Sequence, residues 1–188
     1  SRIEVPMAAG GVGLAAVQIA KAMGATVFAV AGGEEKCALV KDHGADVAID
    51  YRVQNFSEIV LENTNGAGAD IILDSVGGEA TKNSLRCIAR QGQLLIVGFS
   101  SGAIPRIAAN RLLLRRAVAR GIYWDHDRDG EMVARCTKKL IDMCLDGYIR
   151  PVVTADYGLE DLPAALDHLR AGGTVGKLAL DMGRGEKS

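Results

Sequence analysis

A run of small residues near the N-terminus has the composition of a phosphate-binding turn. Residues 8–14 read AAGGVGL and open an amphipathic stretch over 12–23. Glycines at a strand-to-helix junction permit a tight turn and close approach to the backbone, and amide groups at the helix N-terminus favour a pyrophosphate. The fingerprint G-x-G-x-x-G is met only with Ala8 in its first position, before Gly10 and Gly13, so the pattern match alone is weak evidence for nucleotide binding. A tight turn without a ligand is the alternative interpretation.

The segment about 20 positions further on favours a ligand with an extra phosphate. In sites that prefer NADH, an acidic residue there accepts hydrogen bonds from the ribose hydroxyls. Residues 31–33 are Ala-Gly-Gly instead, which leaves room for a 2'-phosphate, and Lys36 can supply the positive charge. The sequence therefore predicts NADPH as the cofactor. Glu34 or Glu35 could still reach a ribose, and all three charged residues could form an ordinary solvated first helical turn.

The elements that would position this site alternate along the first hundred residues. Short apolar runs predict buried parallel strands at 26–31, 47–49, 71–73 and 94–97. Amphipathic segments predict helices at 12–23, 34–43, 56–63 and 79–90. This alternation predicts an α/β fold, a Rossmann-type doubly wound and mostly parallel sheet with helices on both faces.

The pattern changes after Gly98. Further helices are predicted from a cap at Asn110, over 130–145 and over 159–169, and further strands at 117–124, 152–155 and 177–180, before a polar tail at 183–188.

At the other end of the chain, Glu4 and Pro6 are unfavourable in a central strand, because proline removes a ladder donor and a buried carboxylate is costly. We therefore expect residues 2–7 to form a short, distorted or displaced strand.

The composition is that of a soluble globular protein, with 48% hydrophobic and 24% charged residues among 188. The net charge of −1 gives no general attraction to nucleic acid or acidic membranes, although a local patch can exist. The four cysteines form no C-x-x-C pair, which favours a reducing, cytoplasmic setting over a zinc ribbon or a disulfide scaffold. Because no apolar run approaches the roughly 18 residues that span a bilayer, no membrane partner is expected.

Two clusters have ordinary interpretations. Residues 125–129 hold three acids and a histidine, but such a run after a strand is more often a solvated loop than a metal site. His43 and His168 are expected to be surface or capping residues. Five arginines form a basic cluster that is expected to be a solvated helix face. RNA binding is the alternative, but no aromatic stacking surface accompanies the cluster, so nucleic acid is not expected as a partner. The five arginines are Arg106, Arg111, Arg115, Arg116 and Arg120.

Several ordered motifs together resemble one enzyme family. They are AAGGVGLAAVQIAKAMGATVFAVAGGEEK, GADVAIDYR, DSVGG, LLIVGFSSG, GIYW and TVGKLAL. They resemble the zinc-independent medium-chain dehydrogenases/reductases of the NADPH:quinone oxidoreductase type over nearly the whole chain. The resemblance implies that residues 1–188 form the NADP-binding Rossmann domain, without the mostly β catalytic domain that precedes it in relatives. It also implies a homodimer through the edge strand at 117–124.

The resemblance implies a set of cofactor-binding residues as well, but no catalytic residue and no metal ligand. They are Gly10, Gly11, Val12 and Gly13 at the pyrophosphate; Gly33, Lys36 and Tyr51 at the 2'-phosphate; and Ser75, Val76, Gly98, Phe99 and Ser100 below the cofactor and near the nicotinamide. Tyr51 could instead be a half-buried residue at a strand end, and Ser100 a turn residue. The implied activity is hydride transfer from NADPH to a quinone or electron-poor enone. The alternative is a non-catalytic NADPH-binding or interaction module that associates with protein or RNA.

Overall fold

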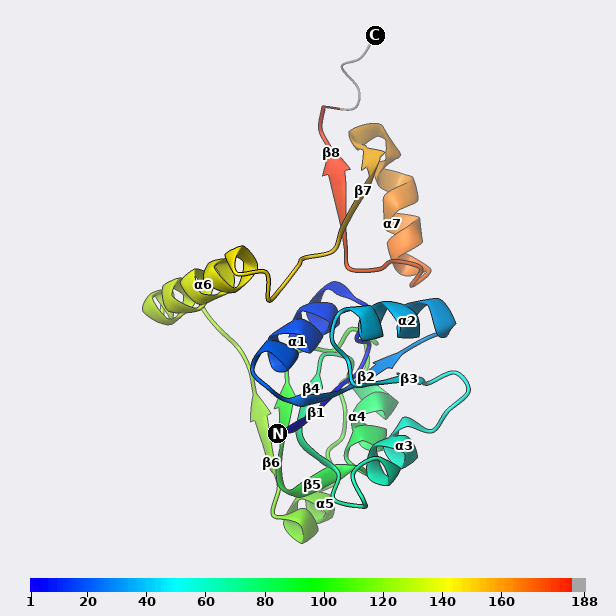
Figure 1. Ribbon diagram of the computed structural model, residues 1–188, viewed down its shortest axis with the longest axis vertical. Helices are drawn as coiled ribbons and strands as arrows, with labels where there is room; N and C mark the ends of the chain where they lie inside the picture. The colour runs from blue at the N-terminus through cyan, green and yellow to red at the C-terminus, as the bar shows by residue number, and fades with distance from the viewer. Residues whose placement is uncertain (184–188) are drawn as a thin grey trace.

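The computed structural model describes residues 1–183, apart from the side chains of 154–156, and contains a six-stranded parallel sheet at its centre. The spatial order β3-β2-β1-β4-β5-β6 reverses direction between β1 and β4 (Figure 1). The strands are β1 (Arg2–Val5), β2 (Thr26–Ala31), β3 (Val47–Asp50), β4 (Ala69–Asp74), β5 (Ile88–Ile96) and β6 (Val118–Gly121). This topology confirms the predicted doubly wound α/β fold, and the reversal is where such sheets bind ligands.

Helices cover both faces of this sheet (Figure 1). They are α1 (Gly11–Ala22), α2 (Glu34–Asp42), α3 (Phe56–Glu62), α4 (Gly78–Ser84) and α5 (Ala109–Arg115). Helix α6 (Gly130–Leu145) has no buried residue and projects away from the sheet (Figure 1). Apolar residues of α1 and α2 share one core with Val5 and alternate residues of β2, whereas Phe28 and Ile72 face a second core with α3 and the end of α4. The two cores therefore lie on opposite faces of the sheet, as its alternating side chains require.

The C-terminal elements form a separate unit above the carboxyl ends of the large sheet (Figure 1). Strands β7 (Val153–Gly158) and β8 (Lys177–Asp181) pair in parallel, and between them lie the 3-10 turn η1 (Leu159–Asp161) and helix α7 (Leu162–Arg170). A bridge between Gly10 and Gly176, and hydrogen bonds of the Gln18 amide with the main chain of Arg150, join this unit to the glycine loop and α1. The predicted final strands thus exist but pair outside the large sheet.

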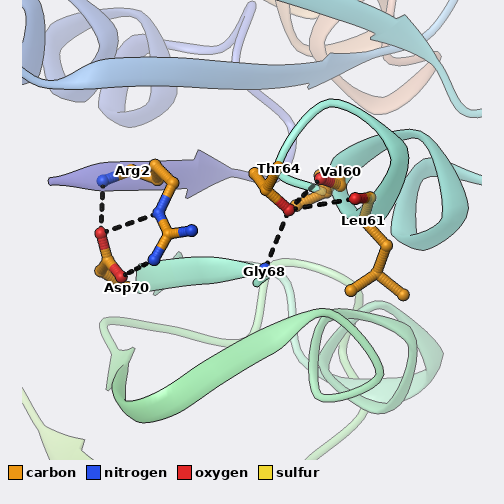
Figure 2. Close-up of polar contacts among 6 residues, drawn as sticks. All are labelled: Arg2, Val60, Leu61, Thr64, Gly68 and Asp70. Carbon is orange, nitrogen blue, oxygen red and sulfur yellow. Dashed lines mark hydrogen bonds and ion pairs between the residues drawn. The ribbon is translucent and has the colours of Figure 1, made fainter. Parts of the chain in front are cut away.

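The first strand is short, as expected, but it is not displaced. β1 lies between β2 and β4, with Glu4 opposite Phe28 on one side and Ile72 on the other. Pro6 falls just beyond the strand, so its missing donor disturbs no ladder. At the start of β1, the main chain and guanidinium of Arg2 donate hydrogen bonds to the Asp70 carboxylate (Figure 2). This pair fixes the beginning of the strand against β4.

Glu4 is completely buried in the second core. Neither of its carboxyl oxygens has a hydrogen-bond partner among the described residues. Burial raises the pKa of Glu4 to about 8; the nearby Ser84 hydroxyl, which lacks hydrogen-bond geometry, opposes the rise, and the Asp74 carboxylate adds to it. The side chain is therefore held mainly in its neutral form at neutral pH.

Several predicted boundaries were wrong. The helix predicted over 79–90 ends at Ser84, because Leu85 and Ile88 enter the core through a turn and 88–90 begin β5. β6 ends at Gly121, short of the predicted 124. Asn110 lies inside α5, whose N-cap is Ala108, so it is not the cap. The predicted polar tail lies, from residue 184 onward, outside the residues that the structure describes.

Candidate functional site

A cleft of about 480 Å³ lies above the carboxyl ends of β1, β2 and β3. Its lining combines the glycine loop, the residues that follow β2 and β3, and the connection from α7 to β8. The lining residues are Met7, Ala9, Gly10, Gly11, Ala31, Gly32, Lys36, Tyr51, Arg52, Ser100, Leu169, Ala171, Gly172, Thr174 and Gly176. The cleft thus joins segments from both ends of the chain.

The glycine loop leaves the N-terminus of α1 open toward this cleft. Met7 has a φ of 48°, in the left-handed region, and its carbonyl accepts a hydrogen bond from the Gly10 amide, which closes a tight turn. Gly10 is the N-cap and supplies no side chain to the free amide groups of the first helical turn. Free amides and the positive end of the helix dipole together suit an anion such as a pyrophosphate.

Gly13 and Gly11 have different roles in this loop. A methyl group on Gly13 would lie 2.5 Å from the Met7 carbonyl oxygen and 2.6 Å from Ala8 Cα, so Gly13 permits the close packing of α1 on β1. A methyl group on Gly11 would lie 3.2 Å from the Lys177 ammonium. A cation therefore stands beside the anion-binding turn. Lys177 was missed from the sequence, because only the fold brings β8 to residues 166 positions away.

Three polar side chains gather at the other end of the cleft, after β2 and β3. The Tyr51 ring lies over Gly32, where a methyl group would approach its hydroxyl to 2.9 Å. The Gly33 amide donates to the Asp50 carboxylate at 3.0 Å, and a methyl group on Gly33 would lie 3.2 Å from the Arg52 guanidinium. Hydrogen bonds from the Gly33 and Arg52 amides lower the pKa of Asp50. The sequence analysis missed Arg52, although it directly follows Tyr51.

Lys36 reaches across this end of the cleft. Its ammonium donates a hydrogen bond of 2.5 Å to the Gly172 carbonyl, in the connection between α7 and β8. No carboxylate of the described residues forms an ion pair with Lys36, and Glu34 and Glu35 are exposed outside the cleft lining. Lys36 thus reaches toward the connection between α7 and β8 and does not pair with an acidic residue of its own helix. Together with Tyr51 and Arg52, it gives the cleft a cationic, hydrogen-bonding end.

A second hollow of about 500 Å³ adjoins the cleft, and Met7 and Tyr51 line both. Its wall is largely apolar, with polar side chains toward α3 and α4. The remaining lining residues are Pro6, Val30, Gln54, Asn55, Phe56, Val76, Ala80, Asn83 and Arg86. An apolar wall with a few polar groups suits a flat heterocycle such as a nucleobase.

The structure brings half of the twelve predicted site residues to these two hollows. Gly10, Gly11, Lys36, Tyr51 and Ser100 line the cleft, and Val76 lines the second hollow. Six others line neither: Val12, Gly13, Gly33, Ser75, Gly98 and Phe99.

These six residues lie immediately behind or beside the cleft. Val12 is exposed on α1, and Gly13 and Gly33 shape the backbone as described. The Ser75 carbonyl accepts the Ser100 amide at 3.0 Å, and Phe99 packs against Gly77. This pairing holds the turn after β5 against the end of β4.

The described residues contain no group of three or more His, Cys, Asp or Glu side chains that could hold a metal. In the segment 125–129, Asp125 accepts hydrogen bonds from the amides of Asp127 and Arg128 and thus shapes a turn. His43 bonds the Leu39 carbonyl at the end of α2, as a capping residue does. Within residues 1–183, no helix is long and apolar enough to cross a bilayer.

Comparison with known proteins gives the same architecture. The zinc-binding dehydrogenase family matches residues 11–144, which include the glycine loop from Gly11 onward, five strands of the large sheet and all but the last residue of α6. The chain belongs to this family. Within it, the chain is a medium-chain dehydrogenase/reductase of the quinone oxidoreductase-like type, which confirms the resemblance found in the sequence.

Relatives extend the match to almost the whole chain. A quinone oxidoreductase-like protein 2 homolog of Nematostella vectensis is 36% identical over 183 residues, 95% of this chain and 50% of its own length. The quinone oxidoreductase of Escherichia coli, solved with NADPH, superposes with a TM-score of 0.82 at 29% identity, over 94% of this chain and 55% of that one. A mycobacterial protein solved with NADPH superposes with a TM-score of 0.85 at 33% identity, over 93% of this chain and 55% of that one. The chain spans about half the length of the curated relatives it matches.

Proposed function

We propose that this chain is the NADPH-binding part of an oxidoreductase that transfers a hydride to a quinone or an electron-poor enone. The observation that carries the proposal is the pairing of two anion-binding features in one cleft. An open helix N-terminus lies at one end of the cleft, and Lys36, Tyr51 and Arg52 lie at the other. Lys177 lies against Gly11 at this helix terminus but lines a neighbouring hollow and not the cleft itself. NADPH has a pyrophosphate and a 2'-phosphate, whose separate charges match these two ends.

The residues fit each part of this cofactor. The pyrophosphate would take the amides of Gly11 and its neighbours and the charge of Lys177, and the 2'-phosphate would take Lys36, Tyr51 and Arg52. The adenine suits the apolar wall of the second hollow, beside Val76. Gly98, Phe99 and Ser100, in the turn after β5, would then lie near the ribose and nicotinamide, and Ser75, directly after β4, would lie below the cofactor.

The cofactor, when bound, supplies the hydride; the chain positions it. The glycine loop would hold the phosphates at the N-terminus of α1, and the turn around Phe99 would limit where the nicotinamide end can lie. The connection 171–176 forms part of the cleft wall, through Ala171, Gly172, Thr174 and Gly176. The relatives support the substrate class, since they include a quinone oxidoreductase of Pseudomonas aeruginosa and a 2-haloacrylate reductase of a Burkholderia species.

A non-catalytic NADPH-binding module is the second candidate. It is favoured by the lining of the cleft, whose titratable side chains among the described residues are Lys36, Tyr51 and Arg52, all assigned above to the 2'-phosphate. Turnover of a small quinone by the purified chain would exclude this second candidate. NADPH binding without turnover would favour it.

We also propose a cytoplasmic homodimer that pairs through β6. The β6 strand is the last of the large sheet; Val118 within it, and Ile122 and Trp124 directly after it, are exposed. An exposed apolar edge strand is a ready template for a second copy. Light scattering should give twice the chain mass, and a monomer at micromolar concentration would contradict the dimer.

Titration with NADPH and with NADH, followed by nicotinamide fluorescence, tests the cofactor proposal. We expect saturable binding of NADPH and binding of NADH at least about tenfold weaker, since a charge-assisted hydrogen bond is worth about 1.5–3 kcal/mol. Lys41→Ala, a charge loss at the other end of α2, is the matched control and should change neither affinity. Failure to bind either nucleotide, or tighter binding of NADH, would overturn the proposal.

A further inference from the structure

One carboxylate joins the two loops that carry the cationic end of the cleft. Asp50 is the last residue of β3 and lies opposite Ala31, the last residue of the neighbouring strand β2 (Figure 1). Its Oδ1 accepts a hydrogen bond from the Gly33 amide, which follows β2, and another from the Arg52 amide, which follows β3, each at 3.0 Å. A single side-chain atom therefore ties the two loops to each other.

On the β2 side, this tie fixes the first turn of α2. Gly33 is the N-cap of α2 and has a φ of 94°, in the left-handed region that favours glycine. Its carbonyl accepts the Cys37 amide at 3.1 Å, which is the first hydrogen bond of the helix, and Lys36 stands in this turn. Holding the backbone at Gly33 therefore sets the direction from which Lys36 enters the cleft.

On the β3 side, Asp50 closes the turn that follows the strand. Its carbonyl accepts the amides of Val53 and Gln54 at 3.2 and 2.9 Å, and its amide donates to the side-chain oxygen of Gln54 at 2.9 Å. This turn contains Tyr51 and Arg52, the two other groups that we assign to the 2'-phosphate. Asp50 thus anchors the turn through both its main chain and its carboxylate.

We propose that Asp50 is a positioning residue that gives the cleft its preference for a 2'-phosphate. It lines neither hollow, whereas Lys36, Tyr51 and Arg52 line the cleft. The inference rests on the proposed NADPH site and deepens it, because the carboxylate acts through the two loops and not by contact with the phosphate. When such supporting hydrogen bonds are lost, a site keeps its residues but loses their alignment.

The charge of Asp50 is compatible with a phosphate nearby. Hydrogen bonds from the Gly33 and Arg52 amides lower the pKa of Asp50, so the carboxylate is ionised at neutral pH and is a strong acceptor. The Arg52 guanidinium lies 3.2 Å from the place that a methyl group on Gly33 would take. Two amides and a guanidinium thus offset a charge that would otherwise repel the ligand.

An acid near this place could instead bind the ribose of NADH. In NADH sites, the carboxylate that accepts hydrogen bonds from the ribose hydroxyls follows the second strand. Asp50 ends the third strand, and its Oδ1 already accepts two main-chain amides. These contacts favour a positioning role over direct ribose binding.

Two substitutions at Asp50 separate the acceptor from the charge. Asp50→Ala removes the acceptor. In calorimetric titration it should reduce the preference for adenosine 2',5'-bisphosphate over adenosine 5'-monophosphate from at least about tenfold to about twofold or less, with monophosphate affinity within about twofold of wild type. Asp50→Asn keeps an oxygen acceptor for both amides and removes the negative charge, so it should keep at least the wild-type preference.

Hydrogen exchange of the Gly33 amide, measured by NMR without any nucleotide, gives a second readout. Exchange should be about tenfold faster in Asp50→Ala and close to the wild-type rate in Asp50→Asn, because only the alanine variant leaves this amide without its acceptor. Thermal unfolding checks that both variants are folded.

Asp46→Ala is the matched control, because Asp46 makes an equivalent tie at the other end of the same two strands. Asp46 directly precedes β3, and its carboxylate accepts the Val27 amide of β2 at 2.8 Å. This variant loses a comparable link between β2 and β3 far from the cleft. It should lower stability but keep the preference for the bisphosphate within about twofold.

Four results would overturn the positioning role. They are a wild-type preference in Asp50→Ala, a lost preference in Asp50→Asn, an equal loss in Asp46→Ala, and a larger loss of the monophosphate than of the bisphosphate in Asp50→Ala, which would make Asp50 a ribose ligand. A wild-type chain that binds the two nucleotides equally would instead overturn the proposed function, and this inference with it. The two failures are therefore distinguishable.

Discussion

Glu4 should make the stability of this chain fall as the pH rises. Its pKa is raised from an ordinary 4.5 to about 8, so the folded chain holds this proton more tightly than the unfolded chain does. The free energy of unfolding therefore decreases between pH 4.5 and 8, by up to about 5 kcal/mol in total and about 3 kcal/mol by pH 7. This is a large share of the roughly 5–15 kcal/mol that stabilises a typical domain.

Two substitutions separate the charge of Glu4 from its packing. Glu4→Gln removes the ionisable group and should give a stability that hardly changes between pH 5 and 9. Glu4→Leu also fills the apolar layer formed by Phe28 and Ile72, so it should raise the free energy of unfolding at pH 8 by several kcal/mol. Glu62→Gln, at an exposed position in α3, is the matched control and should keep the wild-type slope.

Urea unfolding at a series of pH values measures these slopes. Asp46 and Asp70 have pKa values lowered by their cationic partners and main-chain donors, so their stabilisation is lost only as the pH falls below their ordinary range. They do not contribute a falling slope above pH 5. A wild-type stability that is flat or rising from pH 5 to 9, or the same slope in Glu4→Gln, would refute the argument.

The remaining predictions concern the cleft and the start of the sheet. Gly13→Ala should lower the free energy of unfolding in urea by about 1–3 kcal/mol, since the added methyl group would meet fixed backbone at 2.5 Å. In Gly11→Ala the methyl group meets the flexible Lys177 side chain, so this variant should weaken NADPH binding more than it lowers stability. Equal effects of the two on stability would contradict these roles. Arg52→Ala should weaken NADPH binding by about tenfold and leave NADH binding unchanged, measured by fluorescence; an equal loss for both would make Arg52 a general structural residue. Asp70→Asn should cost no more than about 1 kcal/mol at pH 7, because the pair with Arg2 is about one third exposed, and the cost should shrink as the pH falls below the ordinary range of a carboxyl group. A loss of the same size in acid would show that packing is responsible.

The sequence predicted the large sheet well because its signals are local. The apolar run at 26–31 coincides with β2, and the glycine turn opens α1 within one residue of the expected start. The helix predicted over 79–90 failed because Leu85 and Ile88 have helical spacing, yet they are buried through a turn and a strand. Periodicity cannot distinguish these two routes into one core.

The sequence predicted only those parts of the candidate site that local signals mark. Gly10, Lys36 and Tyr51 lie at element boundaries that the pattern marks, and they line the cleft. Lys177 and Gly172 come from the far end of the chain. The pairing of Gly10 with Gly176 brings Lys177 to the glycine loop, and Gly172 accepts a hydrogen bond from Lys36. Contacts of this range depend on how the C-terminal unit docks, which no local pattern encodes.

Calorimetric titration with adenosine 2',5'-bisphosphate and with adenosine 5'-monophosphate tests the central claim most directly, because these ligands differ only by the 2'-phosphate. The account predicts that the bisphosphate binds at least about tenfold more tightly, and that Lys36→Ala removes most of this difference without weakening the monophosphate. Equal affinity for the two ligands, or a difference that Lys36→Ala leaves intact, would contradict it.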